Sequence, residues 1–143
     1  MATTKERTIG GLGLFVDCRR DDIAWIAKHA DEVHVPPGRV LALPGDAARE
    51  FVVVIDGVCS ASDGYGEVIL GPGSYWGSAG LLSGRPHGST VRTRTGARLL
   101  VFGVGAFRGL IDRAPSVRDR LLLDLRGRVQ QSDQEELSLR AVS

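Results

Sequence analysis

The sequence predicts a mainly β protein with flanking helices, namely an antiparallel, jelly-roll-like β-roll with a helical lead before it and a helix after it. Three observations support this. Residues 49–55 form a β-branched apolar run. Glycine and proline then recur at short intervals between residues 64 and 73, as they do in antiparallel sandwiches and rolls. Amphipathic helical patterns lie near the two ends of the chain.

The part of the chain before the first strand is predicted to hold a helix. Asp21 and Asp22 would occupy its first turn, where carboxylates interact favourably with the helix dipole, and Ile23 would begin its apolar face. Residues 1–8 are predicted to be a flexible N-terminus. The domain itself is predicted to span residues 9–130.

Two central segments have strand patterns. The run at residues 49–55 ends at Asp56-Gly57, a dipeptide that favours a hairpin turn. Further along, Val91, Thr93 and Thr95 alternate with Arg92 and Arg94. Since successive side chains of a strand point to opposite faces, we expect Val91, Thr93 and Thr95 to be buried and the arginines solvated.

A second helix is predicted near the C-terminus. Pro115 suits the first position of a helix because its missing N–H would have no partner there. Beyond it, apolar residues recur every four positions and would form one stripe: Val117, Leu121, Leu125 and Val129. Residues 131–143 are predicted to be a short polar tail.

Composition is that of a single cytoplasmic domain. The 143 residues can bury close to two-thirds of the unfolded surface, enough for one core. A net charge of +1 gives no electrostatic case for binding nucleic acid or an acidic membrane. Cys18 and Cys59 are predicted to be free thiols in a reducing compartment. The apolar stretch at residues 10–16 is too short for a membrane span and lacks the features of a signal peptide.

The most informative stretch runs from Tyr75 to Val91. It reads Tyr-Trp-Gly-Ser-Ala-Gly-Leu-Leu, a two-residue loop, and then Arg-Pro-His-Gly-Ser-Thr-Val. It resembles the phosphate-binding cassette of the cyclic-nucleotide-binding domain family, which is found in the catabolite activator protein and in protein kinase regulatory subunits. The resemblance covers residues 9–125 and implies a β-roll with a ligand pocket at the cassette.

Two residues of this cassette depart from the family pattern. Ser78 stands where the family has a glutamate that accepts a hydrogen bond from the ribose 2′-OH, and His87 stands where it has an arginine that binds the cyclic phosphate. A charged hydrogen bond contributes about 1.5–3 kcal/mol, so losing both would weaken binding by roughly a hundred- to ten-thousand-fold. The cassette is therefore interpreted as degenerate, and cAMP binding is expected to be weak or absent.

The resemblance implies a set of ligand-binding residues. Backbone N–H groups of residues 78–80 would face the ligand, and Arg85 or His87 would supply positive charge for an anion. The predicted site consists of Gly77, Ser78, Ala79, Gly80, Arg85, His87, Gly88, Ser89 and Thr90. For Trp76, the sequence leaves open whether it fills the roll or offers a stacking surface to a base.

Two functions remain open. One is a ligand-free regulatory or interaction module; the other is a sensor of cAMP, cGMP or another small anion. An open cavity at the cassette would favour the sensor, and a filled one the interaction module. In the family, the C-terminal region resembles a helix through which two domains dimerise, so the residues Val117, Leu121 and Leu125 would contact a second copy or an unknown protein; the alternative is that they pack on their own roll.

Other classes of function are not expected. Only 14 residues follow Val129, too few for a helix-turn-helix, so no DNA-binding domain is predicted. No nucleophile motif indicates an enzyme. His29, His34 and His87 lack metal-ligand spacing, so we predict no metal and no cofactor. Haem held by His87 or Cys59 is the remaining alternative.

Overall fold

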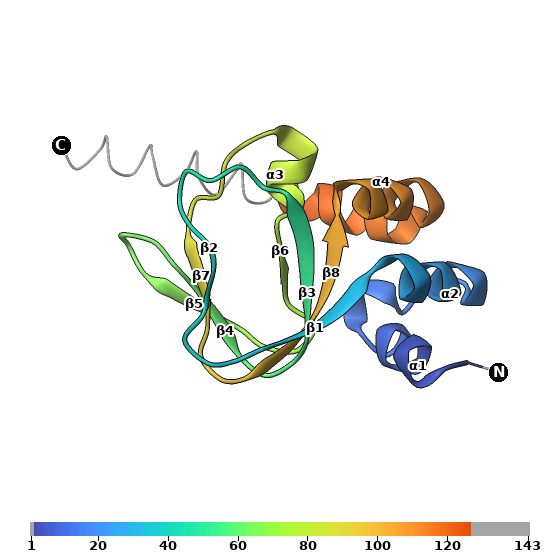
Figure 1. Cartoon of the computed structure of the whole chain (residues 1–143). Helices are drawn as coiled ribbons and strands as arrows, with labels where there is room; N and C mark the ends of the chain where they lie inside the picture. Colours follow the sequence, from blue (N-terminus) through green and yellow to red (C-terminus); the bar gives the residue numbers. More distant parts are fainter. Residues whose placement is uncertain (1, 127–143) are drawn as a thin grey trace.

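The computed structural model describes residues 2–126 as two four-stranded sheets with helices packed against one of them (Figure 1). The order in the first sheet is β1 (Asp31–Val35), β8 (Ala97–Gly103), β3 (Glu50–Asp56) and β6 (Tyr75–Trp76). The order in the second sheet is β2 (Val40–Ala42), β7 (Thr90–Thr93), β4 (Cys59–Ser62) and β5 (Glu67–Leu70). Every strand pair is antiparallel, which confirms the predicted β-roll with flanking helices.

Strand β3 is buried on both faces, which explains its continuous apolar run. Phe51 and Val53 pack in the core between the first sheet and the helices, whereas Val52 and Val54 pack between the two sheets. A strand covered on both sides needs apolar residues at every position. The predicted alternation is confirmed within β7 (Thr90–Thr93), because Val91 and Thr93 are buried. It is wrong at Thr95, which is exposed because β7 ends at Thr93 and the chain turns there.

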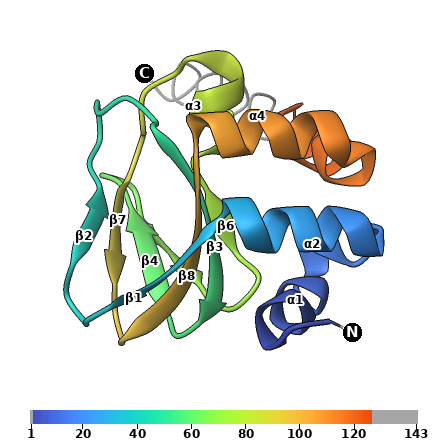
Figure 2. The ribbon, with the colours of Figure 1, turned by 45° about the vertical axis from the view of Figure 1, so that its right-hand side comes forward.

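The helices lie together on the outer side of the first sheet (Figure 2). They are α1 (Thr4–Gly10), the short 3-10 helix η1 (Gly13–Phe15), α2 (Arg20–His29), α4 (Val104–Arg113) and a helical segment over residues 115–126. Arg113 joins α4 to α2, since its Nε lies 3.6 Å from Oδ1 of Asp22 and its guanidinium lies over the Trp25 ring. A further short helix, α3 (Ser78–Ser83), sits at one end of the roll, where its residues Leu81 and Leu82 pack against the same core as the other helices.

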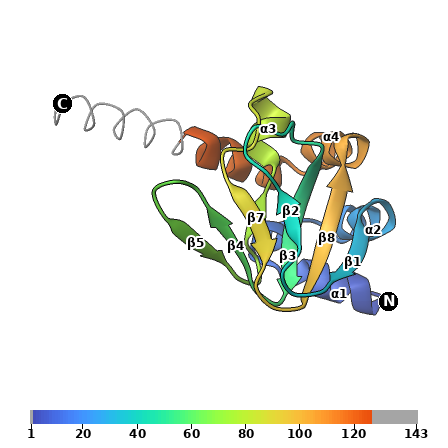
Figure 3. The same ribbon diagram turned by 60° about the vertical axis from the view of Figure 1, so that its left-hand side comes forward.

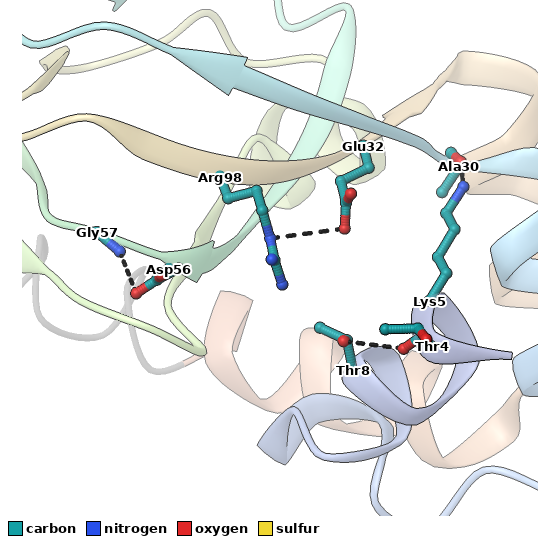
Figure 4. Close-up of polar contacts among 8 residues, drawn as sticks. All are labelled: Thr4, Lys5, Thr8, Ala30, Glu32, Asp56, Gly57 and Arg98. Carbon is teal, nitrogen blue, oxygen red and sulfur yellow. Dashed lines mark hydrogen bonds and ion pairs between the residues drawn. The ribbon is translucent and has the colours of Figure 1, made fainter.

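The N-terminus differs from the prediction, because α1 occupies most of the segment expected to be flexible. The Thr3 hydroxyl caps this helix by accepting a hydrogen bond from the Glu6 N–H at 3.1 Å. Lys5 Nζ donates to the carbonyl oxygen of Ala30 at 2.8 Å (Figure 4), and Ile9 is fully buried. A helix this short depends on tertiary packing, which local sequence patterns do not reveal.

The turn at Asp56-Gly57 is present, but the hairpin predicted there is wrong. Strands β3 and β4 belong to different sheets, so the chain crosses from one sheet to the other at this turn. The carboxylate of Asp56 accepts a hydrogen bond from the Gly57 N–H at 2.9 Å (Figure 4). Gly57 has a φ of +88°, and a Cβ atom built on it would overlap the carbonyl oxygen of Gly96. Glycine is therefore required at position 57 because the chain passes close to Gly96 as it crosses between the sheets, and not because a hairpin turn needs it.

The C-terminal helical segment begins at Pro115 as predicted. Val117 and Leu121 are buried in the core between the helices and the first sheet, and Leu125 is half-buried. The apolar stripe therefore packs on its own roll at Val117 and Leu121, which corrects their assignment as contacts to a second copy or a partner. Val129 and the predicted tail, residues 131–143, lie outside the described residues.

Both cysteines are free thiols, as predicted. Cys59 is buried and Cys18 is half-buried, and in each case burial raises the pKa of the thiol because it disfavours the thiolate. Within residues 2–126, none of the helices has the length and apolarity needed to cross a bilayer.

Leu121 provides a test of the core assignment. Leu121→Asp should lower the free energy of unfolding by more than about 3 kcal/mol, because it removes a buried side chain and buries a charge. The matched control is Leu123→Asp, whose leucine is 63% exposed and whose substitution should change stability by less than about 0.5 kcal/mol. Urea denaturation measures both. A stable Leu121→Asp protein that differs only in oligomeric state would contradict the assignment.

Candidate functional site

A cavity of about 510 Å³ lies at the cassette, between the β4–β5 hairpin and α3. The predicted ligand-binding residues line it with two exceptions, Ser78 and Thr90. Ser78 is the first residue of α3 and is 5% exposed, and Thr90 is half-buried at the start of β7, where it pairs with Ser62. The cavity residues that were predicted are Gly77, Ala79, Gly80, Arg85, His87, Gly88 and Ser89.

Two glycines allow α3 to pack closely against the start of β3 and the residues just before it. Gly77 has a φ of +94°, and a Cβ atom built on it would overlap the carbonyl oxygen of Glu50. A Cβ atom on Gly80 would overlap the side chain of Ala48 and lie 2.8 Å from the carbonyl oxygen of Arg85. Glycine is therefore required at position 77 both for its conformation and for the close approach of two backbones.

The second half of the cassette is held by the loop that follows β2. The Gly45 N–H donates to the carbonyl oxygen of His87 at 2.8 Å, and the His87 N–H donates to the carbonyl oxygen of Asp46 at 2.9 Å. These two bonds fix the backbone at residue 87. The His87 side chain is half-buried and lines both the main cavity and a smaller one of about 210 Å³.

The β4–β5 hairpin supplies a cavity wall that the sequence did not predict. Figure 3 shows this hairpin beside β7. The register pairs Ala61 with Val91 and Ser62 with Thr90, so Asp63 follows the last paired residue of β4, and both Asp63 and Ser89 line the cavity. The carboxylate of Asp63 accepts hydrogen bonds from the N–H groups of Tyr65 and Gly66, at 2.8 and 3.0 Å. A local pattern could not have found this residue, because its place depends on long-range strand pairing.

Strand β5 contributes Val68 and Leu70 to the same wall. Their spacing of two residues puts both on one strand face, and this alternation was the signal available in the sequence. Trp76 and Val91 add to the apolar lining. Tyr75 borders the cavity, but its ring packs against Phe51 in the core between the first sheet and the helices. Trp76 is 8% exposed and packs between the sheets, so it fills part of the roll while still bordering the cavity.

Two side chains of opposite charge are among those that line the cavity. Asp63 and Arg85 are exposed, whereas His87 and Ser89 are half-buried. No group of three or more histidine, cysteine, aspartate or glutamate side chains within residues 2–126 is placed to hold a metal ion. The cavity is thus lined by polar and apolar groups together.

Comparison with known proteins identifies this arrangement. A family model described as the cyclic nucleotide-binding domain matches residues 32–114, more than half of the chain. The chain belongs to the cyclic nucleotide-binding domain family. The match begins in β1 and ends just after α4, so it includes both sheets and the whole cassette.

A curated relative is a cyclic nucleotide-gated potassium channel from Mesorhizobium japonicum, 31% identical over 85 residues. The match covers 59% of this chain and 24% of the channel, and the chain spans about a quarter of the length of the curated relatives it matches.

Two solved structures show the same fold. The catabolite activator protein of Thermus thermophilus has a TM-score of 0.75 at 22% identity, covering 89% of this chain and 62% of that chain. The regulatory subunit of a cAMP-independent protein kinase A from Trypanosoma brucei, a mutant bound to cAMP, has a TM-score of 0.77 at 14% identity. That comparison covers 94% of this chain and 50% of the other.

Gly77 provides a test of how the cavity is built. Gly77→Ala should lower the free energy of unfolding by more than about 2 kcal/mol, since a left-handed conformation costs a side chain roughly 1–2 kcal/mol before the overlap with Glu50 is counted. The control is Gly88→Ala, because a Cβ atom there meets nothing within 4 Å and its φ is not positive. Urea denaturation of both variants measures the difference. Equal stabilities would show that the turn does not need glycine.

Proposed function

We propose that this chain is a non-enzymatic regulatory module whose cavity binds a small ligand and which binds cAMP only weakly. The observation that carries the proposal is the cavity itself. Its volume of about 510 Å³ falls within the range of small-molecule sites, roughly 300–1,000 Å³. Among residues 2–126, neither Trp76 nor Arg85 fills it, and a cavity left open by these residues favours a sensor over a ligand-free scaffold.

The cassette residues account for weak binding of cAMP. Ser78 is short and does not line the cavity, so α3 offers no carboxylate to a ribose 2′-OH. At position 87 an imidazole replaces the planar guanidinium that would bind a phosphate with two parallel hydrogen bonds. Arg85 is exposed, and an exposed ion pair contributes only about 0–1 kcal/mol.

The comparisons support a regulatory role. The relatives include a channel named for gating by cyclic nucleotides, and the structural neighbours include a catabolite activator protein and a kinase regulatory subunit. One of these neighbours is described as belonging to a cAMP-independent kinase. Membership of this fold is therefore compatible with a regulator that does not respond to cAMP.

A second candidate is an interaction module. Leu122 and Leu123, on the helical segment 115–126, are 40% and 63% exposed. Adjacent exposed leucines on one helix favour contact with a second copy or another protein. Sedimentation of the native chain and of Leu123→Asp tests this candidate, since the substitution would then shift a dimer toward monomer. Identical sedimentation of both chains as monomers would exclude contact with a second copy.

Rebuilding the family residues tests the main proposal. Ser78→Glu combined with His87→Arg should raise cAMP affinity by about a hundred- to ten-thousand-fold, because each change adds one charged hydrogen bond. Calorimetric titration measures the affinity. His87→Arg alone is measured as well, because position 87 lines the cavity and position 78 is more deeply buried.

The matched control is Ser78→Gln with His87→Gln, which places an uncharged amide at both positions and should give a much smaller gain. If the charged variants are folded and bind cAMP no better than the native chain, the cavity does not hold a nucleotide in the pose that the family resemblance implies.

A further inference from the structure

The outer edge of β5 lacks the features that protect the other sheet edges. Proteins block such edges with charged side chains, very short strands or bulges, because an open edge can pair with another chain. Here the edge strand β1 carries Asp31, Glu32 and His34, β6 has only two residues, and β2 has three residues with an irregular register. Strand β5 instead pairs with β4 in a regular register over all four of its residues, and within residues 2–126 no strand lies on its other side.

The backbone of β5 presents hydrogen-bonding groups along this edge. The Asp63 N–H donates to the carbonyl oxygen of Gly66 at 3.0 Å, so these two residues form a hydrogen-bonded pair where the hairpin turns. Hydrogen-bonded and non-hydrogen-bonded pairs alternate along an antiparallel ladder. Glu67 and Ile69 therefore belong to the non-hydrogen-bonded pairs of β5 with β4, and their N–H and C=O groups point away from β4, toward the open edge.

The side chains along this edge are mostly apolar and exposed. Val68 and Ile69 are 63% and 61% exposed, and Tyr65, in the turn of the same hairpin, is 89% exposed. Glu67 carries the charge of the strand, but its carboxylate accepts a hydrogen bond from Arg94 of the same sheet. Figure 3 shows the hairpin standing out from the roll. Exposed apolar side chains beside unpaired backbone groups favour the addition of another strand.

We propose that β5 pairs in antiparallel orientation with β5 of a second copy of this chain, which joins the second sheets of the two copies into one continuous sheet. A two-fold axis at Ile69 makes the outward N–H and C=O groups of this residue bond to those of its counterpart. In that register Val68 lies opposite Leu70, so apolar side chains meet apolar ones. Each Glu67 lies opposite Gly71, so the two carboxylates stay apart. A segment that complements itself in this way suits a symmetric pair of identical chains.

This inference goes beyond the proposed function and does not depend on it, because the edge of β5 forms the interface and the cavity does not. Val68 and Leu70 also line the cassette cavity, so the dimer would join the walls of two cavities. Pairing of two four-residue strands makes a small interface, and we therefore expect a dissociation constant in the micromolar range.

Sedimentation equilibrium of the full chain over a range of concentrations tests the proposal. Ile69→Lys should raise the dissociation constant of the dimer about ten-fold or more, because like charges then meet at the axis. The matched control is Val16→Lys, which changes an apolar residue that is also 61% exposed and should leave the dissociation constant unchanged. Leu123→Asp should leave it unchanged as well, which separates this dimer from one formed through residues 115–126. A native chain that stays monomeric at millimolar concentration, or an Ile69→Lys chain that dimerises as the native one does, overturns the proposal.

Two further measurements test the register. The Ile69→Lys chain and the Ile69→Glu chain should each be weakened in self-association, whereas their mixture should form a mixed dimer, because opposite charges then meet at the axis. In the native chain, the amide hydrogen of Ile69 should exchange more slowly as the protein concentration rises, since dimerisation gives it a hydrogen-bond partner. A mixture that associates no better than its components, or an Ile69 amide whose exchange rate is independent of concentration, overturns the pairing of β5 with β5. Urea denaturation of the variants confirms that each is folded.

Discussion

The close approach of Gly77 to β3 positions the rest of the site. Its left-handed backbone brings the start of α3 against the carbonyl oxygen of Glu50, a contact that leaves no room for a side chain. Strand β3 is in turn buried in both cores, between the two sheets and beneath the helices. The first half of the cassette is therefore fixed to the most deeply buried strand of the domain, and the cavity exists because α3 begins at that point.

The frame of the cassette does not depend on the two residues that depart from the family pattern. Its geometry comes from backbone contacts: Gly77 on Glu50, and His87 paired through its own backbone with Gly45 and Asp46. Any residue except proline can make those backbone bonds at position 87. The fold of the site and the side chains that contact its ligand can therefore change separately, so the β-roll can be kept while the family's glutamate and arginine are replaced.

Local patterns in the sequence predicted an element correctly where the burial of that element alone determines which residues it contains. The apolar run of β3, the alternation in β7 and the helix start at Pro115 are of this kind. The features that the sequence did not reveal depend on contacts between distant residues. Helix α1 is held in part by a hydrogen bond to Ala30, and Asp63 reaches the cavity through the register of β4 with β7. The apolar stripe at Val117 and Leu121 was recognised, but a stripe alone does not say whether it packs on its own sheet or on a partner.

The central claim is that the cassette cavity is a working ligand site that binds cAMP only weakly. It is tested most directly by following backbone amide resonances while cAMP is added to the native chain and to the Ser78→Glu, His87→Arg variant. The account predicts that cAMP shifts the amides around the cavity, those of Gly77, Ala79, Gly88 and Ser89, in the variant at concentrations where it leaves them in place in the native chain. Shifts confined to residues outside the cavity, or equal shifts in the two chains at the same concentration, would contradict it.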